Sequence, residues 1–389
     1  MSEVYIVASG MIPVSKYKNE SLGELGSKAI NLALASTELS LDDIGALYAG
    51  NMLAGQLCQQ QLVSALLAQH SNLLGRETIT AEGACASGAA ATRLGFMAIS
   101  SGCHEAVIIC GVEKMSHCSR DQTTQALATA ADRDTESSKG ETFLSLNANI
   151  MRSYLESNKI SRDDFSGFAI NAHRNAMTNP NALFHKSICQ KTYRESHDVS
   201  YPLRLYDSPA ICDGAACIIL TNKKIAKSLR NNGAKVCKIL ASSVVSDNIA
   251  TSKRRDNTWL SAAETSATKA YTKAGLSPQH IDFFEPHDAY TIMSALSLEA
   301  AGFVDRGAAV SIANDNSIGL QGIIPISTFG GLKARGHPVG ATGVYQMAEA
   351  FLQVTGNAND NQVSDANIGL IQNFSGTATV TFTNIIESY

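Results

Sequence analysis

The residue whose surroundings best suit chemistry is Cys85, in the small-residue segment EGACASGAAA between a predicted strand and a predicted helix. Unpaired N–H groups and the positive end of the dipole at a helix N-terminus stabilise a thiolate, so we expect a lowered thiol pKa. The alternative is a small buried hydrophobe, which is the commoner role of a cysteine and the one we assign to the other eight. No C-x-x-C pair is present, so we expect no metal site.

Two histidines stand where a ligand site could form. His337 lies in GGLKARGHPVGATG, a glycine-rich segment before an apolar helix, and could act there as the base for a thiol or simply cap a turn. His287 follows a predicted strand in EPHDAYT, and strand ends are where open α/β sheets assemble ligand sites. We expect two strands joined at Asn373–Gly376, where Gly376 could offer a backbone N–H to an oxyanion or merely make the turn.

The elements that must position these residues alternate between short β-branched runs and longer helical stretches, which predicts an α/β fold. The expected strands of the first half are 4–8, 44–50, 78–82, 106–111 and 215–220, and the expected helices are 22–39, 59–69 and 86–101. Polar, helical sequence between them predicts an inserted lobe. A second series of strands and helices begins at residue 236 and resembles the first.

Two matches within the chain support an internal duplication. Residues 37–51 align without gaps with 274–288, and residues 83–97 align with 336–350. We therefore predict a first half made of 1–115 and 202–235, an inserted loop domain at 116–201 and a second half at 236–389.

Composition excludes several classes of protein. Hydrophobic residues make up 44% of the 389 residues and charged residues 17%, which excludes intrinsic disorder. The net charge of −4 gives no general reason to bind nucleic acid or an anionic membrane. The first residues lack a basic and then apolar leader, and no apolar run is long enough to span a bilayer. We expect a cytoplasmic protein with reduced thiols.

Several separated motifs together resemble the thiolase superfamily. They are EGACASG, GVEKMSH, PLRLYDSPAICDGAA, HDAYT, GGLKARGHPVGATG and QNFSG. The HD pair and the PL…DGAA segment resemble the sterol-carrier-protein type of thiolase and its bacterial and archaeal relatives. The resemblance implies a duplicated five-layer α-β-α-β-α fold with an inserted loop domain, working as a homodimer or homotetramer. It also implies a small partner protein with an OB-fold and a zinc ribbon.

The same resemblance assigns roles to the candidate residues. Cys85 would be the acylated nucleophile, and His337 would take its proton. His287 would hold a thioester oxygen, while the backbone N–H groups of Cys85 and Gly376 would form the oxyanion hole of the acyl-enzyme. Asp288 would be a structural partner of a neighbouring loop. The substrate would be a CoA thioester, with no cofactor.

One departure from the family concerns the second catalytic cysteine, which removes and returns the α-proton of an incoming acetyl-CoA. Sterol-carrier-type enzymes carry it two residues after the HD histidine, where this chain has Ala289. Ordinary thiolases carry it in a C-terminal Cys-x-Gly, where this chain has residues 373–376. Tyr290, Ser375 and Ser327 are candidate auxiliary groups nearby, but phenols and alcohols are weaker bases than thiolates at neutral pH.

Three functions fit these residues. The first is an acyltransferase that loads Cys85 from an acyl-CoA and passes the acyl group to an acceptor that needs no strong enzymic base. The second is an acetyl-CoA C-acyltransferase with a substitute base, and the third is a non-catalytic subunit of a mixed complex. Eight basic residues of the predicted insert could meet the phosphates of CoA: Arg120, Arg133, Lys139, Arg152, Arg174, Lys186, Lys191 and Arg194.

Overall fold

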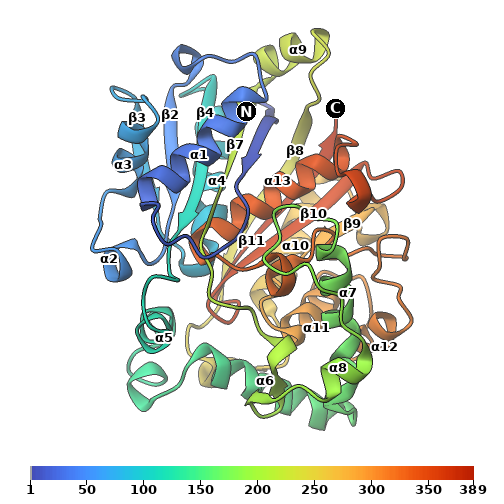
Figure 1. Ribbon diagram of the computed structural model, residues 1–389. Helices are drawn as coiled ribbons and strands as arrows, with labels where there is room; N and C mark the ends of the chain where they lie inside the picture. The colour runs from blue at the N-terminus through green and yellow to red at the C-terminus, as the bar shows by residue number, and fades with distance from the viewer. Residues whose placement is uncertain (1) are drawn as a thin grey trace.

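Nine strands form one mixed sheet in the computed structural model, which describes residues 2–389. Their order across the sheet is β3-β2-β4-β7-β1-β8-β11-β10-β9 (Figure 1). The strands are β1 Val4–Met11, β2 Ala46–Gly50, β3 Glu77–Ala81, β4 Ala106–Glu113, β7 Gly214–Asn222, β8 Cys237–Ser246, β9 Phe283–Glu285, β10 Ile368–Ser375 and β11 Val380–Ser388. The predicted α/β class is therefore confirmed.

The sheet is nearly symmetric about the antiparallel contact between β1 and β8. Outward from this contact the order is β1, β7, β4, β2, β3 on one side and β8, β11, β10, β9 on the other. On its outer side, β9 forms one isolated parallel bridge, from Phe284 to Ile326. Ile326 thus lies in the place that β3 occupies in the first half. Matching strand orders are what a duplicated unit produces.

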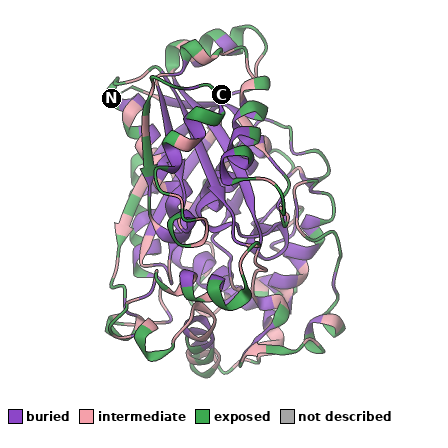
Figure 2. Cartoon of the chain, turned by 60° about the vertical axis from the view of Figure 1, so that its left-hand side comes forward, coloured by how far each residue is buried: buried purple, intermediate pink, exposed green. Residues whose placement is uncertain are grey.

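Helices complete the layers. Helices α1 Leu22–Ala35, α3 Val63–His70 and α9 Lys223–Asn231 cover one face of the first half. Helices α10 Ser261–Ala274 and α11 Thr291–Ala300 lie on the second half, packed against each other, with α10 against β8 and β11. Between the halves lie α4 Ser87–Ser101 and α13 Thr342–Val354. Every residue of α13 except Leu352 is buried, and Figure 2 shows that the interior of the molecule is largely buried. The result is the predicted five-layer arrangement.

The two central helices cross closely near their first turns. A Cβ atom on Gly88 would lie 2.9 Å from the Gly340 carbonyl oxygen, and one on Gly343 would lie 2.4 Å from the Ala89 nitrogen. Only glycine fits where backbones approach so closely. The crossing also brings together the short turns that precede each helix, η2 Ala84–Ala86 and η9 Val339–Ala341.

The predicted polar insert is helical and lies at one end of the sheet (Figure 1). It contains α5 Arg120–Ala128, α6 Phe143–Asn158, α7 Ser166–Ala176, α8 Gln190–Arg194 and β5 Asp198–Ser200. Strand β5 pairs with β6 Leu203–Arg204, which lies just after the insert. Thr142 caps α6 by accepting a hydrogen bond from the Ser145 N–H at 3.2 Å. The shortest helices elsewhere are α2 Ala54–Leu57 and α12 Ala309–Asn314, the latter packed on α7.

The C-terminal hairpin differs from the expectation in one respect. Asn373 does not begin the turn, because the antiparallel ladder continues through Asn373↔Phe382 to Ser375↔Val380. Asn373 is thus a buried residue of β10, and the turn starts at Gly376. Polar residues at 372 and 373 resembled a turn in the sequence, but both lie inside the sheet. Within residues 2–389 no helix is long and apolar enough to cross a membrane.

Candidate active site

A cavity of about 480 Å³ brings the four principal candidates together. Cys85, His287, His337 and Gly376 all line it. Cys85 comes from the turn before α4, His337 from the loop before α13, His287 from the end of β9, and Gly376 from the β10–β11 turn. Much of the remaining wall comes from the insert and the segment that follows it, including Arg120, Thr124, Leu127, Phe143, Leu144, Asn147, Val199, Leu205 and Ile211.

The backbone around Cys85 is held by polar contacts at each step. Ala84 has a positive φ of 49°, a conformation that costs a non-glycine residue energy and that clusters at functional sites. The Ala84 N–H donates to Glu82 Oε1 at 2.6 Å, and Ser87 Oγ donates to the Ala84 carbonyl oxygen at 2.7 Å. These contacts hold the side chain of Cys85 toward the cavity at the helix N-terminus.

The protonation state of Cys85 differs from the expectation. Burial raises the pKa of its thiol to about 12, the negative charge of Glu113 adds to this, and the N–H groups of Cys85 and Gly376 oppose it. The predicted lowering of the thiol pKa is therefore wrong, because burial outweighs the helix N-terminus. Cys85 therefore rests as a neutral thiol, and it would need a base to act as a nucleophile.

His337 is placed to be that base. The residue is only 6% exposed, and burial holds its pKa well below the usual range, with the neighbouring His287 and Arg335 acting in the same direction. Its Nδ1 lies 2.7 Å from Thr342 Oγ1, which also lies 3.3 Å from the Pro338 carbonyl oxygen. Both hydrogen bonds form at once only if Nδ1 carries the proton and the hydroxyl donates to the carbonyl. Nε2 is then free to accept a proton.

His287 lies beside His337, with the ring centroids 5.1 Å apart and the planes nearly perpendicular at 87°. Burial lowers the pKa of His287 to about 3, an effect that the charge of Asp288 opposes and that of Arg335 reinforces. Its Nδ1 lies 3.1 Å from Asn373 Nδ2. His287 is therefore a neutral imidazole at neutral pH, suited to donating a hydrogen bond rather than to carrying charge.

These shifts predict an unusual pH dependence. The reactive state is a neutral thiol beside a neutral imidazole, and it persists because the pKa of Cys85 is about 12 and that of His337 lies well below 6.5. We expect the rate of Cys85 acylation to be flat between about pH 6 and pH 9. A stopped-flow or quenched pH profile would measure this. A limb with its midpoint near the usual histidine value of about 6.5 would contradict it.

The turn that carries Gly376 is held by a residue the motifs did not indicate. Gly376 has a positive φ of 58°. Arg254 donates to the Thr377 carbonyl oxygen at 2.5 Å, to Thr377 Oγ1 at 3.0 Å and to Thr379 Oγ1 at 3.2 Å. Arg254 follows a polar run that reads as a solvated loop, so the sequence carries no signal of this contact.

Glu113 joins the two halves behind the cavity. Its carboxylate accepts hydrogen bonds from the N–H groups of Met52 at 2.9 Å, Leu53 at 3.2 Å and Gly340 at 3.1 Å. Burial raises the pKa of Glu113 to about 7. The motif GVEKMSH contains this residue, but nothing in its spacing indicates a bridge to the loop after His337.

Asp288 turns away from the cavity into a buried network. It accepts hydrogen bonds from Ser327 Oγ at 2.9 Å, the Leu332 N–H at 2.7 Å and Lys333 Nζ at 2.6 Å. Asp288 thereby anchors the loop that leads to His337, as a structural partner. Ser327 is bound in the same network and does not line the cavity, which removes its role as an auxiliary group.

Of the two other auxiliary candidates, Tyr290 lines the cavity and Ser375 does not. Ser375 Oγ donates to the Gly83 carbonyl oxygen at 2.5 Å and does not line the cavity, so it supports the Cys85 turn instead. Tyr290 lines the cavity next to Ala289. Burial raises the pKa of its phenol, and the nearby Cys85 adds to the effect. Tyr290 is thus protonated at neutral pH and can donate a hydrogen bond.

The basic residues of the insert mostly lie elsewhere. Of the eight, only Arg120 lines the cavity, where it is joined by Lys16 from the first half. Neither makes an ion pair with another residue in the range 2–389. By contrast, Arg194 pairs with Asp163 and Lys191 with Glu195.

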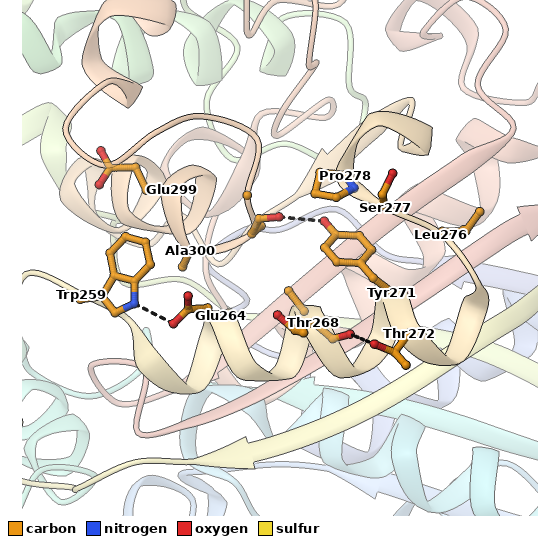
Figure 3. A pocket seen from close by; sticks show the side chains of 13 residues that line it. Trp259, Glu264, Thr268, Tyr271, Thr272, Leu276, Ser277, Pro278, Glu299 and Ala300 are labelled. Carbon is orange, nitrogen blue, oxygen red and sulfur yellow. Dashed lines mark hydrogen bonds between the residues drawn. The ribbon is translucent and has the colours of Figure 1, made fainter.

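A second hollow, of about 350 Å³, lies over α10 (Figure 3). Its polar groups are largely paired: Trp259 Nε1 donates to Glu264 at 2.9 Å, and Tyr271 donates to the Ala301 carbonyl oxygen at 3.0 Å. It contains no cysteine or histidine. The candidate cysteine and histidines therefore meet in the cavity at Cys85 and not in this hollow. Nowhere in residues 2–389 do three or more His, Cys, Asp or Glu side chains cluster in a way that could hold a metal ion.

Comparison with known proteins gives consistent matches over nearly the whole chain. Residues 4–201 match the family described as "Thiolase, N-terminal domain", and residues 243–388 match "Thiolase C-terminal domain-like". The chain is 39% identical over 335 residues to an acetyl-CoA acetyltransferase of Methanothermobacter thermautotrophicus, covering 86% of each. It is 26% identical over 399 residues to sterol carrier protein 2 of Oryctolagus cuniculus, covering 98% of this chain and 72% of the relative.

A solved structure agrees with the fold. The structure named "Ltp2-ChsH2(DUF35) aldolase" superposes with a TM-score of 0.86 at 21% identity, covering 99% of this chain and 98% of the other. At this identity the likeness concerns the fold alone.

Proposed function

The chain belongs to the thiolase family and is an acyltransferase, and from this premise we propose that it forms an acyl-enzyme on Cys85 from an acyl-CoA. The observation that carries the proposal is the cavity shared by Cys85, His337, His287 and Gly376. A thiol, a base and two sets of oxyanion donors are the groups that thioester exchange requires.

The acylation step follows from the protonation states. As Cys85 Sγ attacks the thioester carbonyl carbon, its proton passes to His337 Nε2, and a new carbon–sulfur bond forms. The negative charge on the carbonyl oxygen is stabilised by the N–H groups of Cys85 and Gly376. The bond to the CoA sulfur then breaks, and His337 returns the proton to the departing thiolate. The products are acyl-Cys85 and free CoA.

The acceptor completes the reaction by attacking acyl-Cys85 and releasing the thiol. Ala289 offers no acid or base to create a carbanion, and the phenol of Tyr290 stays protonated. We therefore favour acceptors that need no strong enzymic base, such as an amine, another thiol, water or an electron-rich ring. Tyr290 would hydrogen-bond to an acceptor or thioester oxygen in the same cavity.

The phosphates of CoA have two candidate partners at the cavity. Arg120 and Lys16 line it and make no ion pair among residues 2–389, so their charges are available to an anionic ligand. The other basic residues of the insert lie outside the cavity.

The test is the intact mass after incubation with acyl-CoAs. Acetyl-CoA is expected to add about 42 Da, which is the mass of one acetyl group replacing a hydrogen in covalent catalysis. Peptide mapping should locate the group on Cys85. If acetyl-, propionyl- and longer acyl-CoAs all leave the mass unchanged, the proposal fails and the non-catalytic subunit becomes the better interpretation.

A second candidate is the acetyl-CoA C-acyltransferase, favoured by the name of the relative at 39% identity. It requires a group that replaces the cysteine absent at Ala289. Thiolysis of acetoacetyl-CoA at ordinary enzyme rates, a kcat of about 1 to 10³ per second, would favour this function over the first.

We also propose that the chain works as a homodimer or homotetramer. Strand β3 pairs only with β2, so its other edge is open, and its Ile79 is 42% exposed. An open, partly apolar edge strand is a usual place for chain association. A small second protein is a further proposal, supported by the DUF35 component that the name of the structural neighbour includes.

A further inference from the structure

We propose that Asn373 and Gln346 are positioning residues that hold His287 with its hydrogen on Nε2, so that it donates to a thioester oxygen. This inference rests on the proposed acyl transfer at Cys85. It adds that two buried amides fix the tautomer of His287. Neither residue lines the cavity, and neither belongs to the roles assigned from the motifs.

Gln346, on the buried helix α13, has a side-chain amide whose orientation is fixed by three backbone carbonyls. Its Nε2 lies 2.8 Å from the Pro286 carbonyl oxygen, 3.1 Å from that of Glu285 and 3.2 Å from that of Gln372. Backbone carbonyls only accept hydrogen bonds, so the side-chain nitrogen of Gln346 must face them. The opposite end of the amide, Oε1, is therefore an acceptor with a fixed direction.

The orientation of Gln346 decides the orientation of Asn373. Gln346 Oε1 lies 2.5 Å from the side-chain amide of Asn373. If Asn373 turned its oxygen toward this acceptor, two lone pairs would face each other. Asn373 must therefore present Nδ2, and the second hydrogen of that nitrogen points to His287 Nδ1 at 3.1 Å.

The hydrogen bond from Asn373 decides which ring nitrogen of His287 carries the hydrogen. Nδ1 accepts from Asn373 only if it carries no hydrogen, so the single hydrogen of neutral His287 must be on Nε2. His337 is held the other way, because its Nδ1 donates to Thr342. Two histidines with centroids 5.1 Å apart are thus kept in opposite tautomers, one as a donor and one as an acceptor.

The arrangement leaves one group unsatisfied. Asn373 is 1% exposed, and its Oδ1 has no hydrogen-bond partner among residues 2–389. An orphaned buried acceptor costs free energy. An amide kept here at that cost fits a role in orienting His287 better than a role in stabilising the fold.

The direct test is the tautomer of His287 in the free protein, measured by long-range ¹H–¹⁵N correlation on ¹⁵N-histidine-labelled samples, with His287→Gln to assign the signal. We expect the Nε2–H pattern in the unsubstituted protein and a mixture of tautomers in Asn373→Leu. An Nδ1–H pattern in the unsubstituted protein, or an unchanged pattern in Asn373→Leu, would overturn the inference.

Kinetics test whether the tautomer matters. Acetoacetyl-CoA and acetyl-CoA both deliver acetyl to Cys85, but only the former releases an enolate, whose oxygen His287 would hold. Because Ala289 offers no acid, water must protonate the enolate carbon, so this reaction is slow and is followed in a single turnover. Asn373→Leu and Gln346→Met are expected to slow single-turnover acetylation by acetoacetyl-CoA by about 10- to 100-fold, below the roughly 10² to 10³ of a lost oxyanion donor. Acetylation by acetyl-CoA should change little. Equal slowing with both substrates would indicate a merely structural role.

Two controls make the outcome specific to His287. Gln353 lies two turns beyond Gln346 on α13, is equally buried and bonds the Asn361 carbonyl oxygen at 2.8 Å, so Gln353→Met controls for loss of a buried amide. In a His287→Ala background, Asn373→Leu should have no further effect on the rate. The tautomer of His287 is measured without any substrate. The absence of acyl transfer at Cys85 can therefore be distinguished from the absence of the Nε2–H tautomer.

Discussion

Replacing Cys85 with serine is expected to abolish the acetyl adduct and to lower acyl transfer by about 10⁴-fold or more, as in other enzymes that lose their nucleophile. The thiol of Cys85 already has a raised pKa, and in the proposed mechanism it passes its proton to His337. A serine hydroxyl is harder still to ionise, and His337, whose pKa is itself low, is too weak a base to compensate. The measurement is intact mass and single-turnover rate with acetyl-CoA.

A matched control for this substitution exists within the same cavity. Cys118 also lines it, but its Sγ contacts the Leu57 carbonyl oxygen at 3.7 Å and does not share the helix N-terminus of Cys85. Cys118→Ser should therefore keep the adduct and most of the rate. If Cys85→Ser retained the adduct while Cys118→Ser lost it, the nucleophile would have been assigned to the wrong cysteine.

Introducing a cysteine at position 289 is expected to increase the thiolysis of acetoacetyl-CoA by about 10²- to 10⁴-fold, the range of one added acid/base group. Ala289 lines the cavity with Cys85 and Tyr290, so a thiol there would share the space in which the acyl group reacts. The added sulfur is small enough for a cavity of about 480 Å³. The measurement is the steady-state rate with acetoacetyl-CoA and CoA.

Ala289→Ser is the control for size and polarity, because an alcohol has no useful acidity at neutral pH. It should leave thiolysis near the level of the unsubstituted protein. If the unsubstituted protein already reached ordinary thiolase rates, or if Ala289→Cys gave no gain while its fold and Cys85 acylation stayed intact, the missing cysteine would not be what limits this reaction.

The sequence predicted the principal groups of the site because each lies at a recognisable break between elements. Cys85 and His337 precede helices, His287 follows a strand, and Gly376 makes a turn, so their motifs carry their positions. The predicted lowering of the Cys85 pKa failed for a different reason. It depended on the depth of burial and on Glu113, and neither can be read from neighbouring residues.

The residues that the sequence did not indicate act across long separations. Asn373 meets His287 from 86 positions away, and Arg254 meets Thr377 from 123. Their types are ordinary, and their local surroundings resemble a turn and a solvated loop. The parallel pairing of β10 with β9 brings Asn373 beside His287. The pairing of β11 with β8 brings the segment after β8, which carries Arg254, to the β10–β11 turn. Tertiary structure therefore decides the roles of both residues.

The close crossing of α4 and α13 has a consequence for the origin of the chemistry. The two helices occupy corresponding places in the two halves, yet the turn before one carries Cys85, the proposed nucleophile, and the loop before the other carries His337, its proposed base. If the two halves were identical, the same side chain would precede both helices. A thiol could then not pass its proton to an imidazole across the crossing. In this chain the two positions carry different groups, and the close crossing at Gly88 and Gly343 brings both turns to one cavity.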